Sequence, residues 1–168
     1  MTDTSSAGTG RGGLWGHGHQ AGQVTAETAF PQPETWLSHR VSYGETDAMG
    51  YVYYAEYLHY FERARSQYIR ELGMSYAEAE RRGVFLPVRE AGCRYRVPSR
   101  YDDLIWIRAG ISKWGRASLD FVYEVLDEGR GRLLATGFTR HASVDATGRP
   151  APLPGWFLEA FKPGRVGP

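Results

Sequence analysis

The stretch YGETDAMGYVYYAEY, from Tyr43 to Tyr57, places a carboxylate just before a helical pattern that lacks a capping side chain. An α-helix begins with four amide N–H groups that have no partner inside the helix, and Ser, Thr, Asp or Asn usually caps them. None of the residues 50–53 carries a suitable side chain. These amides, at the positive end of the helix dipole, are therefore free to bind an oxygen with partial negative charge, such as a ligand carbonyl.

Asp47 lies in the same loop, where an ionised carboxylate could act on whatever the amides hold. Gly50 would allow the backbone or a ligand to approach closely. An electrophilic group and a base would then meet in one small site. The competing explanation is that water caps the helix and that Asp47 only shapes a turn. The residues alone leave both explanations open.

The signatures of other common enzyme classes do not occur in the chain. There is no nucleophile elbow, phosphate-binding loop, dinucleotide fingerprint or zinc-protease motif. The single cysteine, Cys93, excludes an internal disulfide and is expected to be a buried small hydrophobe on an apolar strand stripe. His17 and His19 lie in a glycine-rich stretch, where we expect solvated side chains and no metal site.

The composition further limits the class of protein. The 168 residues suffice for one domain, and a hydrophobic content of 42% suffices for a core. Twenty Lys and Arg against nineteen Asp and Glu give a formal charge of +1, which disfavours nucleic acid as a partner. No apolar run reaches the roughly 18 residues that cross a bilayer, and no signal-peptide pattern is present. We therefore expect no membrane span and a cytoplasmic location.

The distribution of apolar residues divides the chain into three parts. Residues 1–33 are predicted to be a disordered tail rich in Gly and Ser, residues 34–162 the folded domain, and residues 163–168 a C-terminal tail. Within the domain, apolar and polar residues alternate in five segments, which predicts five strands. The stripes are Leu37, His39, Val41 and Tyr43, in a strand that starts at Trp36; Ala91, Cys93, Tyr95 and Val97; Ile105, Ile107, Ala109 and Ile111; Ala117, Leu119, Phe121, Tyr123 and Val125; and, less cleanly, Leu134, Thr136, Phe138, Ala142 and Val144.

Helical patterns interrupt these strands. Residues 54–72 carry apolar side chains at spacings of three and four, which predicts an amphipathic helix stopped by Gly73. Ser75 begins a capping pattern for a short helix that ends at Gly83, and PLPGWFLEAF predicts a closing helical turn. One strand, one long helix and four further strands indicate an α+β fold, with an antiparallel sheet packed on one helix. Apolar residues remain on the outer face of the sheet and predict an oligomer: Trp106, Val122 and Leu133.

The segment TDAMGYVYYAEYLHYFERAR resembles the signature of the 4-hydroxybenzoyl-CoA thioesterase-like family of hotdog-fold thioesterases. That signature, D-x-x-G-x-V-Y/F-x-x-x-Y followed by a helix with E-x-A-R, is matched by Asp47, Gly50, Val52, Tyr53, Tyr57, Glu62, Ala64 and Arg65. The segments YRVPSRYDD and GRASLDFVYEV resemble the same family, so the likeness covers residues 36–145. It implies a hotdog fold, in which a five-stranded antiparallel sheet wraps around one long helix, assembled as a homodimer or homotetramer.

The resemblance also implies hydrolysis of an acyl-CoA thioester without a metal or an organic cofactor. Asp47 would be the catalytic carboxylate, either as nucleophile or as general base for water, and the backbone N–H of Tyr54 would polarise the thioester carbonyl. Many relatives carry His at the position of Tyr54 and Asn or Ser at that of Glu56. Glu56 is therefore either a solvated residue or a second carboxylate able to order water, and the role of the Tyr54 side chain stays open.

CoA carries phosphates and a narrow pantetheine arm, so an Arg-lined mouth leading to an apolar slot is expected. Four arginines on polar strand faces or turns are candidates for the phosphates: Arg94, Arg96, Arg100 and Arg116. Gly115 and Ser118 resemble the family segment that approaches the pantetheine arm near the subunit interface. The acyl slot could be lined by Tyr53, Tyr57, Tyr60 and Phe61, although aromatic residues at helical spacing usually form core. Gly50 and Val52 are also predicted to bind the substrate.

Two other polar residues of the predicted helix are expected to have no catalytic role. Glu62 is expected to pair with Arg65 one turn along, and His59 to be solvated. Two other functions stay open: a non-catalytic hotdog module that binds an acyl-CoA or a protein, and a hotdog dehydratase. A dehydratase usually places a His and a carboxylate in its site, and neither His39 nor His59 falls in the matching loop.

Overall fold

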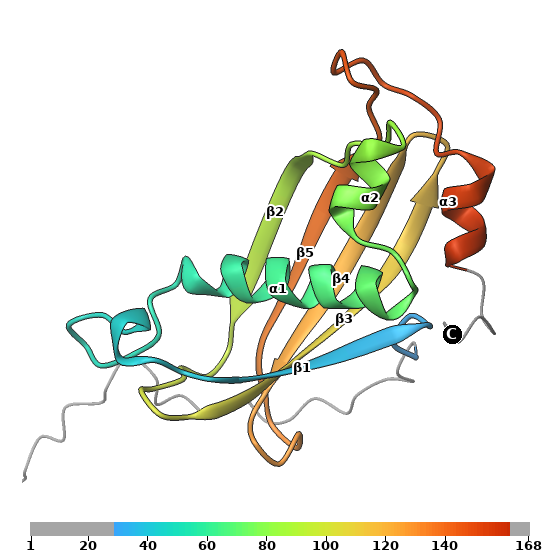
Figure 1. Ribbon diagram of the computed structural model, residues 1–168. Helices are drawn as coiled ribbons and strands as arrows, with labels where there is room; N and C mark the ends of the chain where they lie inside the picture. Colours follow the sequence, from blue (N-terminus) through green and yellow to red (C-terminus); the bar gives the residue numbers. More distant parts are fainter. Residues whose placement is uncertain (1–28, 162–168) are drawn as a thin grey trace, which may run out of the picture.

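The computed structural model describes residues 29–161, in which a sheet curls around one long helix (Figure 1). The five strands lie in the order β1-β3-β4-β5-β2, and all neighbours are antiparallel. The predicted α+β arrangement is therefore confirmed. The elements are β1 (Glu34–Arg40), the 3-10 turn η1 (Tyr43–Glu45), α1 (Glu56–Glu71), α2 (Tyr76–Arg81), β2 (Val88–Tyr95), β3 (Leu104–Gly115), β4 (Ser118–Leu126), β5 (Leu133–Ala142) and α3 (Gly155–Ala160).

Most of the two predicted tails lies outside the described residues. This applies to residues 1–28, with His17 and His19, and to residues 162–168. The proposed extent of the tails and the solvation of these two histidines therefore stay predictions.

Contact with the sheet begins slightly before the predicted domain start at residue 34. The Cζ atom of Arg108 lies 4.1 Å from the ring centroid of Phe30. Gly110 of β3 makes room for this ring, because a methyl group at that position would touch it. Strand β1 likewise starts at Glu34, two residues before the expected start at Trp36.

Helix α1 supplies the centre of the core. Gly73, with a φ of +81°, follows its C-terminal end, as predicted. The helix begins later than expected, at Glu56, and Tyr54 and Leu58 are 61% and 41% exposed rather than buried. The residues that α1 does bury recur at spacings of three and four: Tyr57, Tyr60, Phe61, Ala64, Tyr68 and Ile69.

The two short helices occur where the sequence predicted them. The Ser75 hydroxyl accepts the N–H of Glu78 at 3.1 Å and so caps α2. Phe161, directly after α3, packs against Tyr68 of α1 and Trp114 of β3, with ring centroids 6.1 and 4.9 Å apart. Helix α3 therefore closes the core at the C-terminal end of α1, as Figure 1 shows.

Strand β5 departs from the predicted alternation, which placed Leu134, Thr136 and Phe138 on the core face. Two successive residues of β4 pair with Ala135 and Leu133, and this leaves Leu134 as an extra residue between them. Such a bulge shifts the alternation by one position. Beyond it, the core face of β5 is made by Gly137, Thr139 and His141.

A chain of hydrogen bonds crosses the core beneath β5. The His141 ring lies 2.9 Å from the Leu86 carbonyl through Nδ1 and 2.9 Å from the Thr139 hydroxyl through Nε2. A carbonyl only accepts, so Nδ1 carries the proton and Thr139 donates to Nε2. The Tyr123 hydroxyl, 2.8 Å from that of Thr139, then donates to it. Burial lowers the pKa of His141 to about 4, which keeps the ring neutral.

The predicted ion pair between Glu62 and Arg65 is wrong. Among residues 29–161, no carboxylate forms an ion pair with Arg65. Its side chain turns inward instead, with Cζ 5.5 Å from the ring centroid of Tyr76. Burial opposes the charge of Arg65, but the neighbouring Tyr76 and Tyr123 outweigh that effect and raise the pKa of the guanidinium.

Strand β2 lies at one edge of the sheet and pairs only with β5. Its other edge therefore presents backbone N–H and C=O groups to whatever lies beside it. None of the helices in the described part of the chain is long and apolar enough to cross a membrane.

Candidate active site

Asp47 lies in a tight hairpin that runs from Glu45 to Tyr53. The N–H of Tyr53 donates to the carbonyl of Glu45 at 2.8 Å. The N–H of Asp47 donates to the carbonyl of Tyr51, also at 2.8 Å. The N–H of Gly50 closes the turn on the Asp47 carbonyl at 2.9 Å, with a φ of +74° that glycine adopts without strain. The turn itself therefore requires Gly50.

The Asp47 carboxylate uses only one of its oxygens to shape this turn. Oδ1 accepts the N–H groups of Met49 and Tyr51 at 2.8 and 3.4 Å. Oδ2 accepts no hydrogen bond from residues 29–161. The structural and the chemical explanation of Asp47 are therefore compatible, because the turn fixes one oxygen and leaves the other available.

Two amides before α1 lack a protein acceptor. Ala55, the N-cap residue, provides no side-chain cap. The N–H of Glu56 donates to the Tyr53 carbonyl at 2.9 Å, so the first helical amide is already bonded. Within the described residues, the N–H groups of Tyr54 and Ala55 donate to none of the protein's acceptors. Tyr54 thus lies in the turn two residues before the helix, rather than at its first position.

A narrow cleft of about 210 Å³ opens beside Asp47, and most of its lining is apolar. Five of the residues predicted for the site line it together: Asp47, Val52, Tyr54, Tyr57 and Arg96. Five other lining residues were not predicted: Met49, Tyr51, Tyr95, Val97 and Pro98.

Tyr95 is the most informative of the missed residues. The strand alternation assigned it to the core, but it is 44% exposed and lies at the end of β2. Its hydroxyl donates to the carbonyl of Tyr54 at 2.9 Å, and its ring meets Tyr57 edge-on at 5.1 Å. Burial raises the pKa of Tyr57 and Tyr95, so both hydroxyls stay protonated. Tyr95 therefore ties the sheet edge to the start of the helix.

Other predicted residues surround the cleft without lining it. The Cζ atom of Arg100 lies 4.6 Å from the Tyr51 ring centroid, and a side chain at Gly50 would come within 3.8 Å of Arg100. Tyr53 is 43% exposed and packs on Tyr54. Arg94, on β2, is exposed.

The remaining predicted residues lie elsewhere in the fold. Gly115, Arg116 and Ser118 form the hairpin between β3 and β4. This hairpin lies next to α3, whereas the Asp47 loop lies at the opposite end of α1 (Figure 1). Within one chain these three residues do not meet Asp47.

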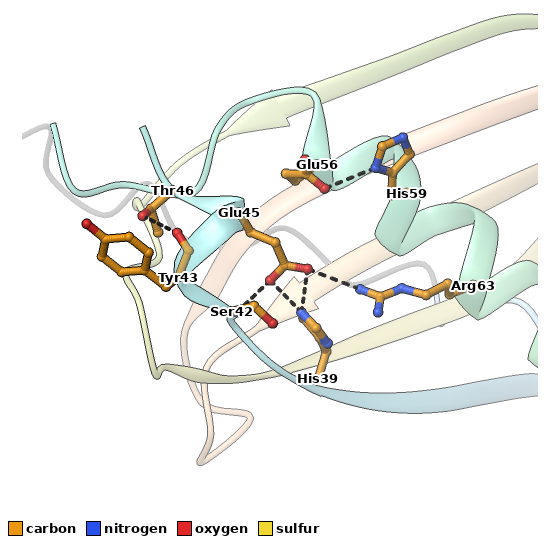
Figure 2. Close-up of polar contacts among 8 residues, drawn as sticks. All are labelled: His39, Ser42, Tyr43, Glu45, Thr46, Glu56, His59 and Arg63. Carbon is orange, nitrogen blue, oxygen red and sulfur yellow. Dashed lines mark hydrogen bonds and ion pairs between the residues drawn. The ribbon is translucent and has the colours of Figure 1, made fainter. Parts of the chain in front are cut away.

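A second polar cluster, absent from the sequence prediction, adjoins the hairpin. Figure 2 shows the Glu45 carboxylate between His39 of β1 and Arg63 of α1. Nε2 of His39 lies 3.0 and 2.8 Å from the two carboxylate oxygens, and the N–H of Ser42 donates at 2.7 Å. The sequence did not predict the contact between His39 and Glu45. The two residues are six positions apart across the end of a strand, and this spacing matches neither helix nor strand periodicity.

Glu56 and His59 form a pair on the exposed side of α1. Their carboxylate oxygen and Nδ1 atom are 3.0 Å apart, and the His59 side chain is 68% exposed (Figure 2). The expectation of a solvated His59 is confirmed. The Glu56 side chain is only 24% exposed.

The hairpin from Ser143 to Ala151 repeats the turn of the Asp47 hairpin. The N–H of Ala151 donates to the carbonyl of Ser143, that of Asp145 to Arg149, and that of Gly148 to Asp145, each at 2.9 Å. Gly148 has a φ of +80°. Oδ1 of Asp145 accepts the N–H groups of Thr147 and Arg149 at 2.8 and 3.1 Å. The same D-A-x-G sequence therefore builds the same turn twice.

Metal and thiol chemistry find no support in the described part of the chain. Residues 29–161 contain no group of three or more His, Cys, Asp or Glu side chains that could hold a metal ion. Burial raises the pKa of the Cys93 thiol to about 11, so it stays protonated near neutrality.

A five-stranded sheet curled around one helix, with a carboxylate-bearing hairpin at the helix start, defines the hotdog class of thioesterases. DHNA-CoA thioesterase from Staphylococcus aureus has this arrangement in common with the chain: the TM-score is 0.69 at 31% identity, over 75% of this chain and 85% of that one. The hotdog fold predicted from the sequence is therefore confirmed.

Sequence comparison places the chain within that class. The profile of the thioesterase-like superfamily matches residues 41–161, and the chain belongs to this superfamily. A protein of Aquifex aeolicus is 32% identical over 123 residues, which are 73% of this chain and 94% of that protein. The acyl-CoA thioesterase YbgC of Haemophilus influenzae is 37% identical over 83 residues, which are 49% of this chain and 61% of that protein. The predicted enzyme class, a thioester hydrolase, is thereby confirmed.

Proposed function

We propose that the chain hydrolyses acyl-CoA thioesters in the cleft beside Asp47. The observation that carries this proposal is that Asp47 and Tyr54 line one narrow, largely apolar cleft. Asp47 brings a carboxylate oxygen that the turn does not use, and Tyr54 brings an N–H without a protein acceptor. A base and a hydrogen-bond donor for a developing oxyanion are the two groups that thioester hydrolysis needs.

The reaction can use the Asp47 carboxylate in two ways. As a general base, it takes a proton from water while the water oxygen attacks the thioester carbonyl. As a nucleophile, it attacks the carbonyl itself and forms an anhydride, which water then hydrolyses. In both cases the N–H of Tyr54 would stabilise the oxyanion, and the carbon–sulfur bond breaks. The leaving CoA thiolate takes up a proton released from the attacking water, so the products are the free acid and the CoA thiol.

The substrate would enter with its CoA end at the basic rim. Arg96 lines the cleft, and Arg100 lies just outside it on the Tyr51 ring. Guanidinium groups there suit phosphate oxygens, while the tyrosine-lined interior suits an apolar acyl group. Arg94, whose side chain is exposed on the strand before the cleft, is a further candidate for the CoA phosphates.

The proposed enzyme is a homodimer or homotetramer. Strand β2 has an open edge, and Gly115, Arg116 and Ser118 lie far from Asp47 in one chain. These three residues could serve a site only in a neighbouring subunit. A monomeric mass at micromolar concentration, measured by light scattering, would contradict both the oligomer and a shared site.

The decisive experiment measures the release of free thiol from short-chain, long-chain and aromatic acyl-CoAs. Wild type should hydrolyse at least one of them, and Asp47→Asn should lose about 10²- to 10⁴-fold in rate on it. The amide oxygen of asparagine can still accept the two turn N–H groups, so folding should be preserved. Equal rates for the two proteins on every active substrate would refute the assignment. Stabilisation by CoA without turnover of any thioester would favour a non-catalytic module.

A further inference from the structure

Glu45 contacts three different elements at the base of the Asp47 hairpin. Its carboxylate accepts from His39 of β1, accepts the N–H of Ser42, and lies 3.9 Å from the Arg63 guanidinium of α1 (Figure 2). Its backbone carbonyl accepts the N–H of Tyr53, on the opposite arm of the hairpin. One residue therefore joins the first strand, the hairpin and the long helix.

The Glu45 carboxylate is held in its ionised form. Burial alone would raise the pKa of Glu45, since its side chain is only 18% exposed. The hydrogen bonds from His39 and from the Ser42 N–H more than offset this and lower the pKa. The His39 side chain is itself only 14% exposed. Charge-assisted contacts in such a shielded place are stronger and more directional than those on an open surface.

The hairpin backbone does not need this carboxylate in order to form. In the second D-A-x-G hairpin, Ser143 occupies the position that corresponds to Glu45, and the same backbone hydrogen bonds are present. The Glu45 side chain must therefore contribute something other than the turn. What it adds is a fixed placement of the hairpin against β1 and α1, because His39 and Arg63 belong to those two elements.

That placement matters for the proposed chemistry. Asp47 follows Glu45 by two residues, and Tyr54 directly follows Tyr53, whose N–H is bonded to the Glu45 carbonyl. A shift of the hairpin base would thus move the carboxylate and the Tyr54 N–H together, relative to the cleft wall on β2. A misplacement of about 1 Å in an enzyme site can reduce the rate about a hundredfold.

We propose that Glu45, held by His39 and Arg63, is a positioning residue that locks the Asp47 hairpin onto the strand and the helix. This inference rests on the proposed function for its effect on turnover. Its effect on the hairpin itself does not, so the two can be tested separately.

The test combines kinetics with amide hydrogen exchange in the full-length protein. Glu45→Ala should lower kcat about 10- to 100-fold with KM changed by less than about threefold, as for other residues that orient a catalytic group. The amides of Asp47, Gly50 and Tyr53 should exchange at least about tenfold faster, because the hairpin loses its charged anchor. Glu45→Gln keeps an acceptor for the Ser42 N–H and should fall between Glu45→Ala and wild type in both measurements.

Two controls separate positioning from general destabilisation. Glu124 of β4 is also a partly buried glutamate in an ion pair, 3.3 Å from Arg108. Glu124→Ala should leave kcat and the hairpin amides unchanged. His39→Gln retains a donor for Glu45, so its effects on kcat and on hairpin exchange should be smaller than those of His39→Leu. The comparison of these two variants remains informative if Glu45→Ala folds poorly.

The outcomes distinguish the two proposals. Unchanged exchange at the hairpin amides in Glu45→Ala and His39→Leu would overturn the positioning role. Faster exchange together with a kcat within twofold of wild type would also overturn it, since the placement would not matter for turnover. If wild type hydrolysed no thioester while the hairpin amides still depended on Glu45, the anchor would stand and the proposed function would fail.

Discussion

The hairpins 45–53 and 143–151 have the same backbone and different surroundings. Both place an aspartate at the first position of the turn, bond its Oδ1 atom to the amides two and four residues later, and use a glycine with positive φ. Only the first runs into a long helix with two unbonded amides before it. In the second, Pro152 and Leu153 stand at the positions of those two amides: Pro152 has no N–H, and the N–H of Leu153 donates to the Arg116 carbonyl at 2.9 Å.

The carboxylates themselves also differ. Oδ1 of Asp145 takes a third hydrogen bond, from the Thr147 hydroxyl at 2.7 Å, and this contact with the two amides lowers the pKa of Asp145. Met49 stands at the corresponding place beside Asp47 and has no hydroxyl. An aspartate in a D-A-x-G turn is therefore ordinary turn chemistry. The cleft and the free amides beside the first turn are what make it a candidate site.

The largest expected effect comes from exchanging both aspartates for asparagine in parallel. Asp47→Asn should reduce thioester turnover about 10²- to 10⁴-fold, whereas Asp145→Asn should leave it within about twofold. Both changes keep an oxygen for the turn amides, so thermal unfolding should report similar, small losses. Comparable losses of activity in the two variants would mean that the loss in Asp47→Asn does not report a role of its carboxylate in the reaction.

The two hairpins should respond differently to acid. His141, two residues before Ser143, has a pKa lowered by burial to about 4, against about 6.5 in an unfolded chain. As the pH falls from about 6.5 to 4 the unfolded state gains a proton that the folded state does not, so stability decreases by up to about 3 kcal/mol. Denaturant titrations across this range should show the loss, and His141→Asn should reduce its pH dependence.

The anchor of the first hairpin also weakens in acid, but at a lower pH. The lowered pKa of Glu45 means that its contribution is present above the usual glutamate value of 4.5 and is lost only as the pH falls below that value. As the pH is lowered towards 5, the protection of amides against exchange, relative to their intrinsic rates, should therefore fall around Ser143 before it falls around Asp47. The reverse order would show that the neutral His141 ring does not limit stability near the second hairpin.

Replacing either of the two turn glycines should destabilise the protein by a similar amount. Gly50 and Gly148 have φ values of +74° and +80°, and alanine at either position should cost about 1 kcal/mol of unfolding free energy. Space does not distinguish them, since a Cβ atom at Gly50 lies 3.8 Å from Arg100 and one at Gly148 meets nothing within 4 Å. Only Gly50→Ala should also lower kcat. Steady-state kinetics and chemical denaturation of both variants provide the comparison.

The smallest effect concerns the contact that the first hairpin makes with the sheet edge. Tyr95→Phe removes the hydrogen bond to the Tyr54 carbonyl and should cost about 0.5–1.5 kcal/mol. A rate loss of less than about tenfold is expected, because the ring contact with Tyr57 is kept. An unchanged rate and stability would show that this hydrogen bond does not help to hold the first hairpin in place.

The sequence predicted those parts of the fold that follow from local periodicity. The apolar spacing of α1, the stop at Gly73 and the Ser75 cap are each set by a few neighbouring residues. The carboxylate at Asp47 and the open amides before the helix were also readable, because a missing cap is a local property. The likeness to a known family then supplied the reaction.

Features set by contacts between distant residues were not predicted. The bulge at Leu134 depends on how β5 pairs with β4, and the inward turn of Arg65 depends on Tyr76 and Tyr123. The bond between Glu45 and His39 arises only when a strand end folds back. The second D-A-x-G turn, by contrast, was visible in the sequence at Asp145, and it shows how weak that motif is without its surroundings.

Gly137 has a consequence for how this enzyme could diversify. A methyl group there would overlap the Phe61 ring of α1, so the depth at which the helix lies in the sheet cannot change by simple substitution. This contact sets how closely α1 approaches β5 at this point. Changes in substrate preference are therefore expected at the cleft mouth, which Met49 lines with a side chain that is 70% exposed.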